Sequence, residues 1–434
     1  MRGNAVLILV VNCGGSSIKY KLIQMDSELM LAWGCLENIA SAEALLTHYG
    51  LNHAPVRREL PYVEYSGGLD EILKLLVDPQ SGVVADYNAI AAVGHRVVHA
   101  GEEFRGPVLI DEKVMAALTR CIELAPLHNP ANIMGIRACQ KLMPAKPQVA
   151  VFDNAFHREI PDYVYIYGLP YEYYEKYGVR RYGFHGISFA YMAARTEELL
   201  GIDLRQKRAV FLMLGSGCTA NAFAFGKSLD VSTGFTPNEG LIQSSRSGDV
   251  DAAAISFIMR KEGLAPDELD DVLYRQSGWL GISGVSKDFR AVEQAAHAGN
   301  PRARLAIDAF VYRAKKYVGA YAAAMGGLDL LVFAGGVGEK SHEVRQAICL
   351  GLEFLGIRLD SNLNAGLNGE GLISDHAAAA PVLVVNSNEE IYIARETQKT
   401  LAQGKMGYKY LADAGGCGEN ERYRTSLCRV SPKG

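Results

Sequence analysis

The chain has 434 residues, of which 49% are hydrophobic, and a formal net charge of −4 at pH 7. This length exceeds what one hydrophobic core usually supports, so we expect two domains. A chain with neither a basic excess nor a long run of Lys and Arg is not expected to bind nucleic acid. No stretch approaches the roughly 20 apolar residues of a membrane-spanning helix. Eight cysteines without a C-x-x-C pair favour a reduced, cytoplasmic protein over a disulfide framework.

The first predicted element is a strand that ends in a tight glycine turn. Residues 6–11 form an apolar run, residues 12–17 are rich in glycine and serine, and the alternation over 18–23 predicts a second strand. With Ala5 included, the apolar run is about seven residues, which is short for a signal peptide, so we interpret it as a buried strand. The same pattern returns at residues 208–214, 215–217 and 220–225. Its recurrence predicts a duplicated unit.

The remaining elements alternate between the two types of secondary structure. Strands are predicted at residues 90–98, 148–153, 328–334 and 382–386, and helical periodicity covers 267–274, 302–325 and 341–355. Such alternation is typical of α/β architecture. The sequence therefore predicts two related α/β domains that face each other across a cleft.

One segment, residues 232–249, combines glycine turns with Arg246 and lies just after the glycine loop at 215–217. Glycine lets backbone N–H groups approach an anion, and a guanidinium binds phosphoryl or carboxylate oxygens in pairs. Together with residues 94–99, 152–157, 182–186 and 333–339, this segment resembles the acetate kinase family. The resemblance extends in order from about Val6 to about Thr400, so it is more specific than any single glycine motif.

The resemblance implies duplicated ribonuclease H-like domains of the actin/Hsp70/sugar-kinase superfamily, with the ligands in an interdomain cleft. It implies a first domain of residues 1–153 plus 388–403. The second domain, residues 154–387, would bind the nucleotide and form a homodimer. Residues 404–434 have no counterpart in the family pattern, and we expect them to be a partly flexible extension.

Arg96 and Arg246 lie in apolar or glycine-rich surroundings, where an arginine needs an anionic partner. From spacing alone, a buried ion pair with Asp153 or Asp249 is as plausible as ligand binding. The resemblance favours ligand binding, because the two active-site arginines of the family fall on Arg96 and Arg246. There they would bind the acceptor carboxylate and brace the transferring phosphoryl group.

Two further residues are candidates for catalysis. Asp153 follows a predicted strand, where a carboxylate serves either as a helix cap or as a functional group. The resemblance makes it the catalytic aspartate, with a role in positioning the metal and the nucleophile. His185 is a lone histidine after a glycine turn and would ordinarily be structural. Its family counterpart contacts the phosphoryl group in the transition state. His95, His99, His128 and His157 are interpreted as structural.

The resemblance also implies residues for a metal and for the other ligands. Glu389 and Asn12 would bind Mg²⁺ or Mn²⁺, although Glu389 could instead complement a helix dipole. The acetate methyl group would contact Val98, Leu127, Phe184 and Pro237. ATP or ADP would be bound by Ser17, Lys19, Gly215, Ser216, Gly217, Asp288, Phe289, Arg290, Gly335, Gly336, Val337 and Gly338.

The chain departs from the family pattern near the expected phosphates. Met213 and Ser216 stand where the family has histidine and asparagine, and Gly15 replaces a serine. Phe189 replaces a histidine, and Asn238 with residues 243–244 alters the segment before Arg246. The departures put the identity of the phosphoryl donor in question, whereas the core catalytic set is complete.

The leading hypothesis is an acetate kinase that transfers the γ-phosphoryl group of ATP reversibly to acetate, with Mg²⁺. A propionate or butyrate kinase would differ in the volume of the carboxylate pocket. A relative that uses pyrophosphate and phosphate would differ in nucleotide dependence. A catalytically weakened, actin-like nucleotide-binding protein is the alternative outside this class. The substitutions at Met213 and Ser216 favour it, whereas the retained site residues argue against it, namely Asn12, Arg96, Asp153, His185, Arg246 and Glu389.

Overall fold

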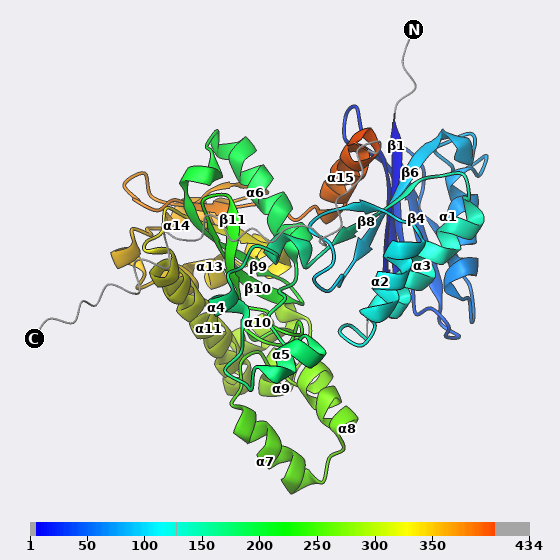
Figure 1. The fold of residues 1–434 in the computed structure, drawn as a ribbon. Helices are drawn as coiled ribbons and strands as arrows, with labels where there is room; N and C mark the ends of the chain where they lie inside the picture. Colours follow the sequence, from blue (N-terminus) through cyan, green and yellow to red (C-terminus); the bar gives the residue numbers. More distant parts are fainter. Residues whose placement is uncertain (1–5, 127, 404–434) are drawn as a thin grey trace, which may run out of the picture.

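The computed structural model describes residues 6–126 and 128–403, which form two lobes around two mixed sheets (Figure 1). Residues 404–434 and Leu127 lie outside the described residues. The larger sheet has the strand order β5-β4-β3-β2-β1-β6-β8-β7, and the smaller has the order β11-β10-β9-β12-β14-β13. Within the described residues, no helix combines the length and the apolar character needed to cross a bilayer.

The larger sheet and its helices form the lobe coloured blue and cyan (Figure 1). Its strands are β1 (Leu7–Gly14), β2 (Ser17–Gln24), β3 (Leu29–Glu37), β4 (Leu45–Gly50), β5 (Val56–Glu59), β6 (Ile90–Val97), β7 (Val108–Leu109) and β8 (Gln148–Phe152). Its helices are α1 (Tyr65–Leu76), α2 (Glu112–Arg120) and α3 (Asn129–Leu142). The last helix of the described chain, α15 (Glu389–Gln403), returns to pack on β1, β6 and β8.

The smaller sheet consists of β9 (Arg208–Leu214), β10 (Cys218–Ala224), β11 (Lys227–Val231), β12 (Leu330–Ala334), β13 (Gly371–Leu372) and β14 (Val382–Val384). The helices of this part of the chain are α4 (Asp162–Tyr165), α5 (Glu172–Tyr177), α6 (Gly186–Leu200), α7 (Ala252–Glu262), α8 (Pro266–Asp271), α9 (Gly278–Ser283), α10 (Phe289–His297), α11 (Pro301–Met325), α12 (Gly335–Lys340), α13 (His342–Cys349) and α14 (Ser361–Gly366).

The two sheets repeat one topology. In the larger sheet, β1 pairs antiparallel with β2 and parallel with β6, which pairs parallel with β8. In the smaller sheet, β9 pairs antiparallel with β10 and parallel with β12, which pairs parallel with β14. Both meanders are extended by a third antiparallel strand, β3 or β11. The predicted duplication and the predicted α/β fold class are therefore confirmed.

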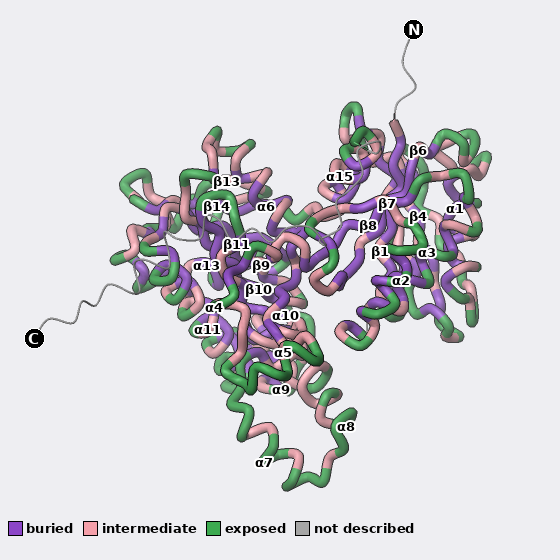
Figure 2. Tube along the Cα trace, in the orientation of Figure 1, coloured by how far each residue is buried: buried purple, intermediate pink, exposed green. Residues whose placement is uncertain are grey.

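An apolar core cluster joins the two lobes. It contains Ile8 and Val151 of the larger sheet, Phe211 of the smaller sheet, and side chains of α6 and α15 between them. Figure 2 shows the sheets as the buried centre of each lobe, whereas α7 and α8 contain no buried residue. The apolar contacts through α6 and α15 fix how the ends of β1, β6 and β8 face the glycine loops of the second lobe.

The predicted elements agree with the structure except at some boundaries. The helix predicted over 341–355 ends at Cys349 as α13, and Gly351 then adopts a φ of 81°. A left-handed residue cannot continue a right-handed helix, so the apolar periodicity after Cys349 belongs to a short turn at Glu353–Leu355. The helix predicted over 267–274 is split between α8 and a wider helical turn at Val272–Gln276.

Candidate active site

The site begins at the carboxyl ends of neighbouring parallel strands. The register pairs Val11 of β1 with His95 of β6. The next residue of each strand, Asn12 and Arg96, therefore lies at the same edge of the sheet. Across the β1–β2 hairpin, Asn12 pairs with Lys19, whose side chain is exposed. Parallel strands bring their carboxyl ends together, so polar residues distant in sequence meet there.

Arg96 forms an ion pair with Asp153, which directly follows β8. Its Nη2 lies 2.6 Å from Oδ2 of Asp153, and its Nε lies 3.7 Å from a carboxylate oxygen of Glu389. Burial raises the pKa of Asp153 to about 6, and the Glu389 carboxylate acts in the same direction, while Arg96 opposes the shift. The Arg96 guanidinium therefore lies beside two carboxylates, and the carboxyl group of Asp153 holds its proton more tightly than that of Glu389.

Glu389 is the first residue of α15, and its carboxylate accepts a hydrogen bond from the hydroxyl of Ser188 in α6. Burial alone would raise the pKa of Glu389, but Arg96 and the Ser188 hydrogen bond outweigh it and hold the pKa below its usual range. Glu389 is therefore ionised at neutral pH. The helix-dipole role and a ligand role are compatible at this position.

His185 precedes α6 in a left-handed conformation, with φ of 59°. Its Nδ1 lies 2.8 Å from the hydroxyl of Thr219 in β10. Burial lowers the pKa of His185 to about 4, and the nearby Arg96 and Arg246 lower it further, although Glu389 opposes them. His185 is thus a neutral imidazole at pH 7, and the charged groups of both lobes act on it.

A glycine at the start of α6 allows this approach between the lobes. Gly186 donates its N–H to the carbonyl oxygen of Asp153 at 2.9 Å. A Cβ at Gly186 would overlap that oxygen, so a larger residue would push α6 away from the end of β8. On the opposite side, a Cβ at Gly217 would lie 3.0 Å from Cε1 of His185. The imidazole is therefore held between the end of β8 and the 215–217 loop.

Arg246 differs from Arg96 in its partners. Within the described residues, no ion pair joins it to a carboxylate, and its Nη1 donates to Oε1 of Gln243 at 3.3 Å. Burial lowers the pKa of Arg246, as expected for a cation without a neutralising partner. The alternative of a buried ion pair therefore applies to one of the two arginines and not to the other. Arg96 is paired with Asp153, whereas Arg246 is a half-buried cation that lacks a neutralising partner.

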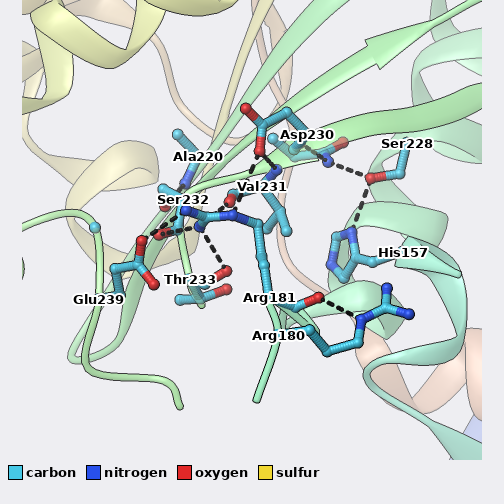
Figure 3. Close-up of polar contacts among 12 residues, drawn as sticks. His157, Arg180, Arg181, Ala220, Ser228, Asp230, Val231, Ser232, Thr233 and Glu239 are labelled. Carbon is cyan, nitrogen blue, oxygen red and sulfur yellow. Dashed lines mark hydrogen bonds and ion pairs between the residues drawn. The ribbon is translucent and has the colours of Figure 1, made fainter. Parts of the chain in front are cut away.

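The segment that leads to Arg246 is anchored at its base by Arg181. Figure 3 shows the Arg181 guanidinium among the carbonyl oxygens of residues 231–233, to which its Nη1 donates at 2.8 to 3.2 Å. Its Nη2 lies 2.6 Å from the carboxylate of Glu239. Tyr167 donates a further hydrogen bond to Glu239. These contacts fix residues 231–239, and so the point from which the segment turns toward Arg246.

The two glycine loops of the second lobe lie side by side. A Cβ at Gly215 would be 3.8 Å from the backbone nitrogen of Gly336, and both Gly336 and Ser216 are exposed. Gly335, with φ of 80°, donates its N–H to Glu339 and to the hydroxyl of Ser387, at 3.0 Å each. Gly336 and Ser216 therefore face solvent, while the Gly335 N–H is already satisfied.

The other residues predicted to bind ligands are distributed as follows. Val98 and Phe184 are buried, Pro237 is half-buried, and Leu127 lies outside the described residues. Phe289 is only 5% exposed and packs against Trp279 in the core, so its ring cannot stack on a nucleotide without moving. Asp288 and Arg290 form an exposed ion pair at the start of α10. Val337 and Gly338 are buried, and Ser17 is half-buried.

Comparison with known proteins identifies the family. The model of the acetokinase family matches residues 7–395. The chain belongs to the acetokinase family. It is 49% identical over 393 residues to an acetate kinase of Caldanaerobacter subterraneus subsp. tengcongensis, an alignment that covers 90% of this chain and 98% of the relative. The resemblance seen in the motifs is thereby confirmed.

Solved structures of the acetokinase family have the same fold as this chain. The crystal structure of Porphyromonas gingivalis acetate kinase matches with a TM-score of 0.88 and 46% identity, covering 92% of this chain and 100% of that one. A propionate kinase from Francisella tularensis matches with a TM-score of 0.85 and 38% identity, covering 91% and 99%.

Three residues of this chain hold site residues in place, a role that the sequence did not assign to them, although Gln243 stood out as a departure from the family pattern. Ser188 holds Glu389, Thr219 holds His185, and Gln243 holds Arg246. The partners of Ser188 and Thr219 are 201 and 34 residues away, so no local pattern reveals these two contacts. His128, interpreted as structural, lies close enough to Arg246 and Arg96 that burial and these two cations lower its pKa to about 4.

Proposed function

We propose that this chain is an acetate kinase, which transfers the γ-phosphoryl group of ATP reversibly to acetate and forms acetyl phosphate and ADP. The observation that carries the proposal is the convergence of Arg96, Asp153, Glu389, His185 and Arg246 beside the 215–217 loop. This set contains fixed positive charge, a neutral donor and two carboxylates. Phosphoryl transfer depends mainly on positioning and charge stabilisation, which such a set supplies.

The acceptor needs no general base. An acetate carboxylate has a pKa of about 4 to 5 and is already ionised at neutral pH. One of its oxygens attacks the γ-phosphorus, and the bond from that phosphorus to the bridging oxygen of ADP breaks. Arg246 has no carboxylate partner among the described residues, so it can pair with an incoming anion without first breaking an ion pair. Val98, Phe184 and Pro237 would contact the methyl group.

His185 would act as a hydrogen-bond donor rather than as a cation. Its pKa of about 4 leaves the ring neutral. Its Nε2 faces Gly217, because a Cβ added at Gly217 would lie 3.3 Å from that nitrogen. When the Thr219 hydroxyl donates to Nδ1, the proton of the imidazole is on Nε2. We infer that this N–H donates to an equatorial oxygen of the transferring phosphoryl group.

The phosphates of ATP would lie on the exposed backbone of the paired glycine loops, between Ser216 and Gly336. Gly215, Gly217 and the 335–338 turn would shape this surface, and Ser17 and Lys19 would approach from the first lobe. Asp288, Phe289 and Arg290 would lie near the adenine and ribose.

The residues present suit a hard divalent cation. Glu389 is held ionised and Asn12 lies beside Arg96 at the strand ends, so a carboxylate and an amide oxygen are available. Mg²⁺ takes few protein oxygens and keeps its waters, which agrees with the lack of a three-residue His, Cys, Asp or Glu cluster in the described chain. Bound Mg²⁺ or Mn²⁺ would neutralise phosphate charge. Asp153 would hold the nucleophile and the metal waters in place.

We further propose that residues 1–153 with 388–403 form one domain and residues 154–387 a second. Closure of the first domain over the ligands would exclude water from the phosphoryl group. Homodimerisation through the second domain is supported by α7, which exposes Phe257 and Ile258. Sedimentation as a monomer at micromolar concentration would contradict the dimer.

The reduced cysteines support a cytoplasmic protein, because all six in the described residues are free.

The test is an assay of acyl phosphate formation with acetate, propionate and butyrate, each combined with ATP, GTP and pyrophosphate. The proposal requires that acetate with ATP and Mg²⁺ gives the highest kcat/KM. A preference for propionate would reassign the chain toward enzymes such as the Francisella tularensis relative. Turnover with pyrophosphate but not ATP would reassign the donor, and nucleotide binding without turnover would favour a weakened, actin-like protein.

A further inference from the structure

Gln243 is a buried amide inside the predicted active site. The residue is 1% exposed, and its side chain makes three hydrogen bonds, each to a different part of the site. Oε1 accepts from Nη1 of Arg246 and from the backbone N–H of Cys218, both at 3.3 Å. Nε2 donates to the carbonyl oxygen of Pro237 at 2.7 Å. Both polar atoms of the amide are therefore satisfied without a ligand.

The position of Gln243 links the cation to the anion-binding loop. Cys218 follows the 215–217 loop directly, and a Cβ at Gly217 would lie 3.6 Å from Oε1 of Gln243. Pro237 belongs to the wall of the proposed carboxylate pocket. One side chain thus joins the glycine loop, Arg246 and the pocket wall.

A neutral partner suits a cation that must later bind an anion. Arg96 is held by the carboxylate of Asp153, which neutralises its charge. Arg246 is held by an amide oxygen, which restricts the guanidinium but leaves its positive charge intact. A carboxylate in this place would form an ion pair that an incoming phosphoryl group would have to break.

We propose that Gln243 is a positioning residue, which orients Arg246 toward the 215–217 loop and keeps it charged. The inference rests on the proposed function, because Arg246 is a site residue only if this region transfers a phosphoryl group. Gln243 touches neither substrate in this scheme and acts through Arg246. Its position is one of those at which this chain departs from the family pattern, so the device belongs to this chain.

The first test replaces the amide by a thioether of nearly the same volume, in Gln243→Met. Loss of a hydrogen bond to a charged group predicts a roughly tenfold fall in kcat with little change in the KM for acetate. Gln148→Met is the matched control. It removes another buried amide, which bonds to His95 at 2.8 Å, and should lower stability without lowering kcat. An unchanged kcat in Gln243→Met would overturn the inference.

A double-mutant cycle separates positioning from general loosening. If Gln243 acts through Arg246, Gln243→Met lowers kcat in the wild-type background but not in Arg246→Ala. Losses that multiply in the double variant would show a purely structural role and would overturn the inference. Should Gln243→Met fail to fold, Gln243→Asn, which keeps a neutral amide but draws its oxygen away from Arg246, enters the same cycle with the same expected outcome.

A measurement in the absence of substrates distinguishes failure of this inference from failure of the proposed function. The ¹⁵N NMR signal of the Arg246 side chain, assigned by its loss in Arg246→Lys, should be broadened or shifted in Gln243→Met and unchanged in Gln148→Met. Wild-type protein that does not phosphorylate acetate would refute the proposed function. An Arg246 signal unaffected by Gln243→Met would refute the positioning role, whatever the activity.

Discussion

The raised pKa of Asp153 predicts an unusual dependence of stability on pH. The carboxyl is 2% exposed, and burial raises its pKa from 3.8 to about 6. The native state therefore holds this proton more tightly than the unfolded chain does. Between pH 4 and 6 the unfolded chain has released the proton while the native state still binds it, so this group's contribution to stability falls as the pH rises.

The shift of about two pKa units corresponds to about 3 kcal/mol over the whole range, and about 1 kcal/mol of it falls between pH 5 and 7. Asp153→Asn removes the titration. Wild type and Asp153→Asn are unfolded with urea at half-unit steps from pH 5 to 7. The unfolding free energy of the wild type minus that of Asp153→Asn should fall as the pH rises. The difference between the two proteins cancels the titration of carboxylates that are unaffected by the exchange.

Asp329→Asn is the matched control. Hydrogen bonds from Arg208 lower the pKa of Asp329, so its stabilising effect is lost only as the pH falls through that lowered value. The corresponding difference for Asp329→Asn should therefore be flat between pH 5 and 7. A flat or rising difference for Asp153→Asn in the same window would refute the assignment of a raised pKa. It would show instead that the Arg96 ion pair dominates over burial.

Three further predictions concern the other site residues. Arg96→Ala and Arg246→Ala should each lower kcat by orders of magnitude, and near-normal turnover in either folded variant would contradict the site. Only Arg96→Ala leaves buried carboxylates unpaired, so it should also lower the free energy of unfolding by about 3 to 5 kcal/mol. Glu389→Ala should raise the Mg²⁺ concentration needed for half-maximal rate, and an unchanged metal titration would leave Glu389 with its helix-dipole role. Met213→His combined with Ser216→Asn should raise kcat/KM for ATP about tenfold, and an unchanged value would mean that the loss is compensated.

The elements that position the site could be predicted because their signals are local. The apolar run of β1, its glycine turn and the alternation of β2 lie within one short segment, and the recurrence at β9 and β10 exposes the duplication. The motif residue Arg96 lies at the end of such a strand, Asp153 follows another, and His185 follows a glycine turn. Their convergence then follows from parallel pairing of β1, β6 and β8, which sets the ends of the strands side by side.

The partners within the site could not be predicted, because they depend on packing between distant segments. Ser188 and Glu389 are 201 residues apart and meet only because α15 returns to pack on α6. The surroundings of Phe289 could not be predicted from the sequence either. The family resemblance implied that Phe289 binds the nucleotide, whereas in the structure the amphipathic helix α10 turns its ring toward Trp279 and Phe310 in the core.

Apart from Gly15 in the β1–β2 turn, the departures from the family pattern lie in the second lobe, and this argues for a remodelled donor side rather than a lost enzyme. Met213 and Gln243 both belong to the second lobe, around the loops where the phosphates would lie, whereas the Arg96, Asp153 and Glu389 cluster of the first lobe is complete. The Met213 thioether lies 3.8 Å from the Ser387 hydroxyl, which also contacts Gly335 and Glu339. A protein that had lost phosphoryl transfer would have no need to keep a charged Arg246. Here a buried amide holds that cation in place without neutralising it, which is the arrangement that binding a phosphoryl group requires.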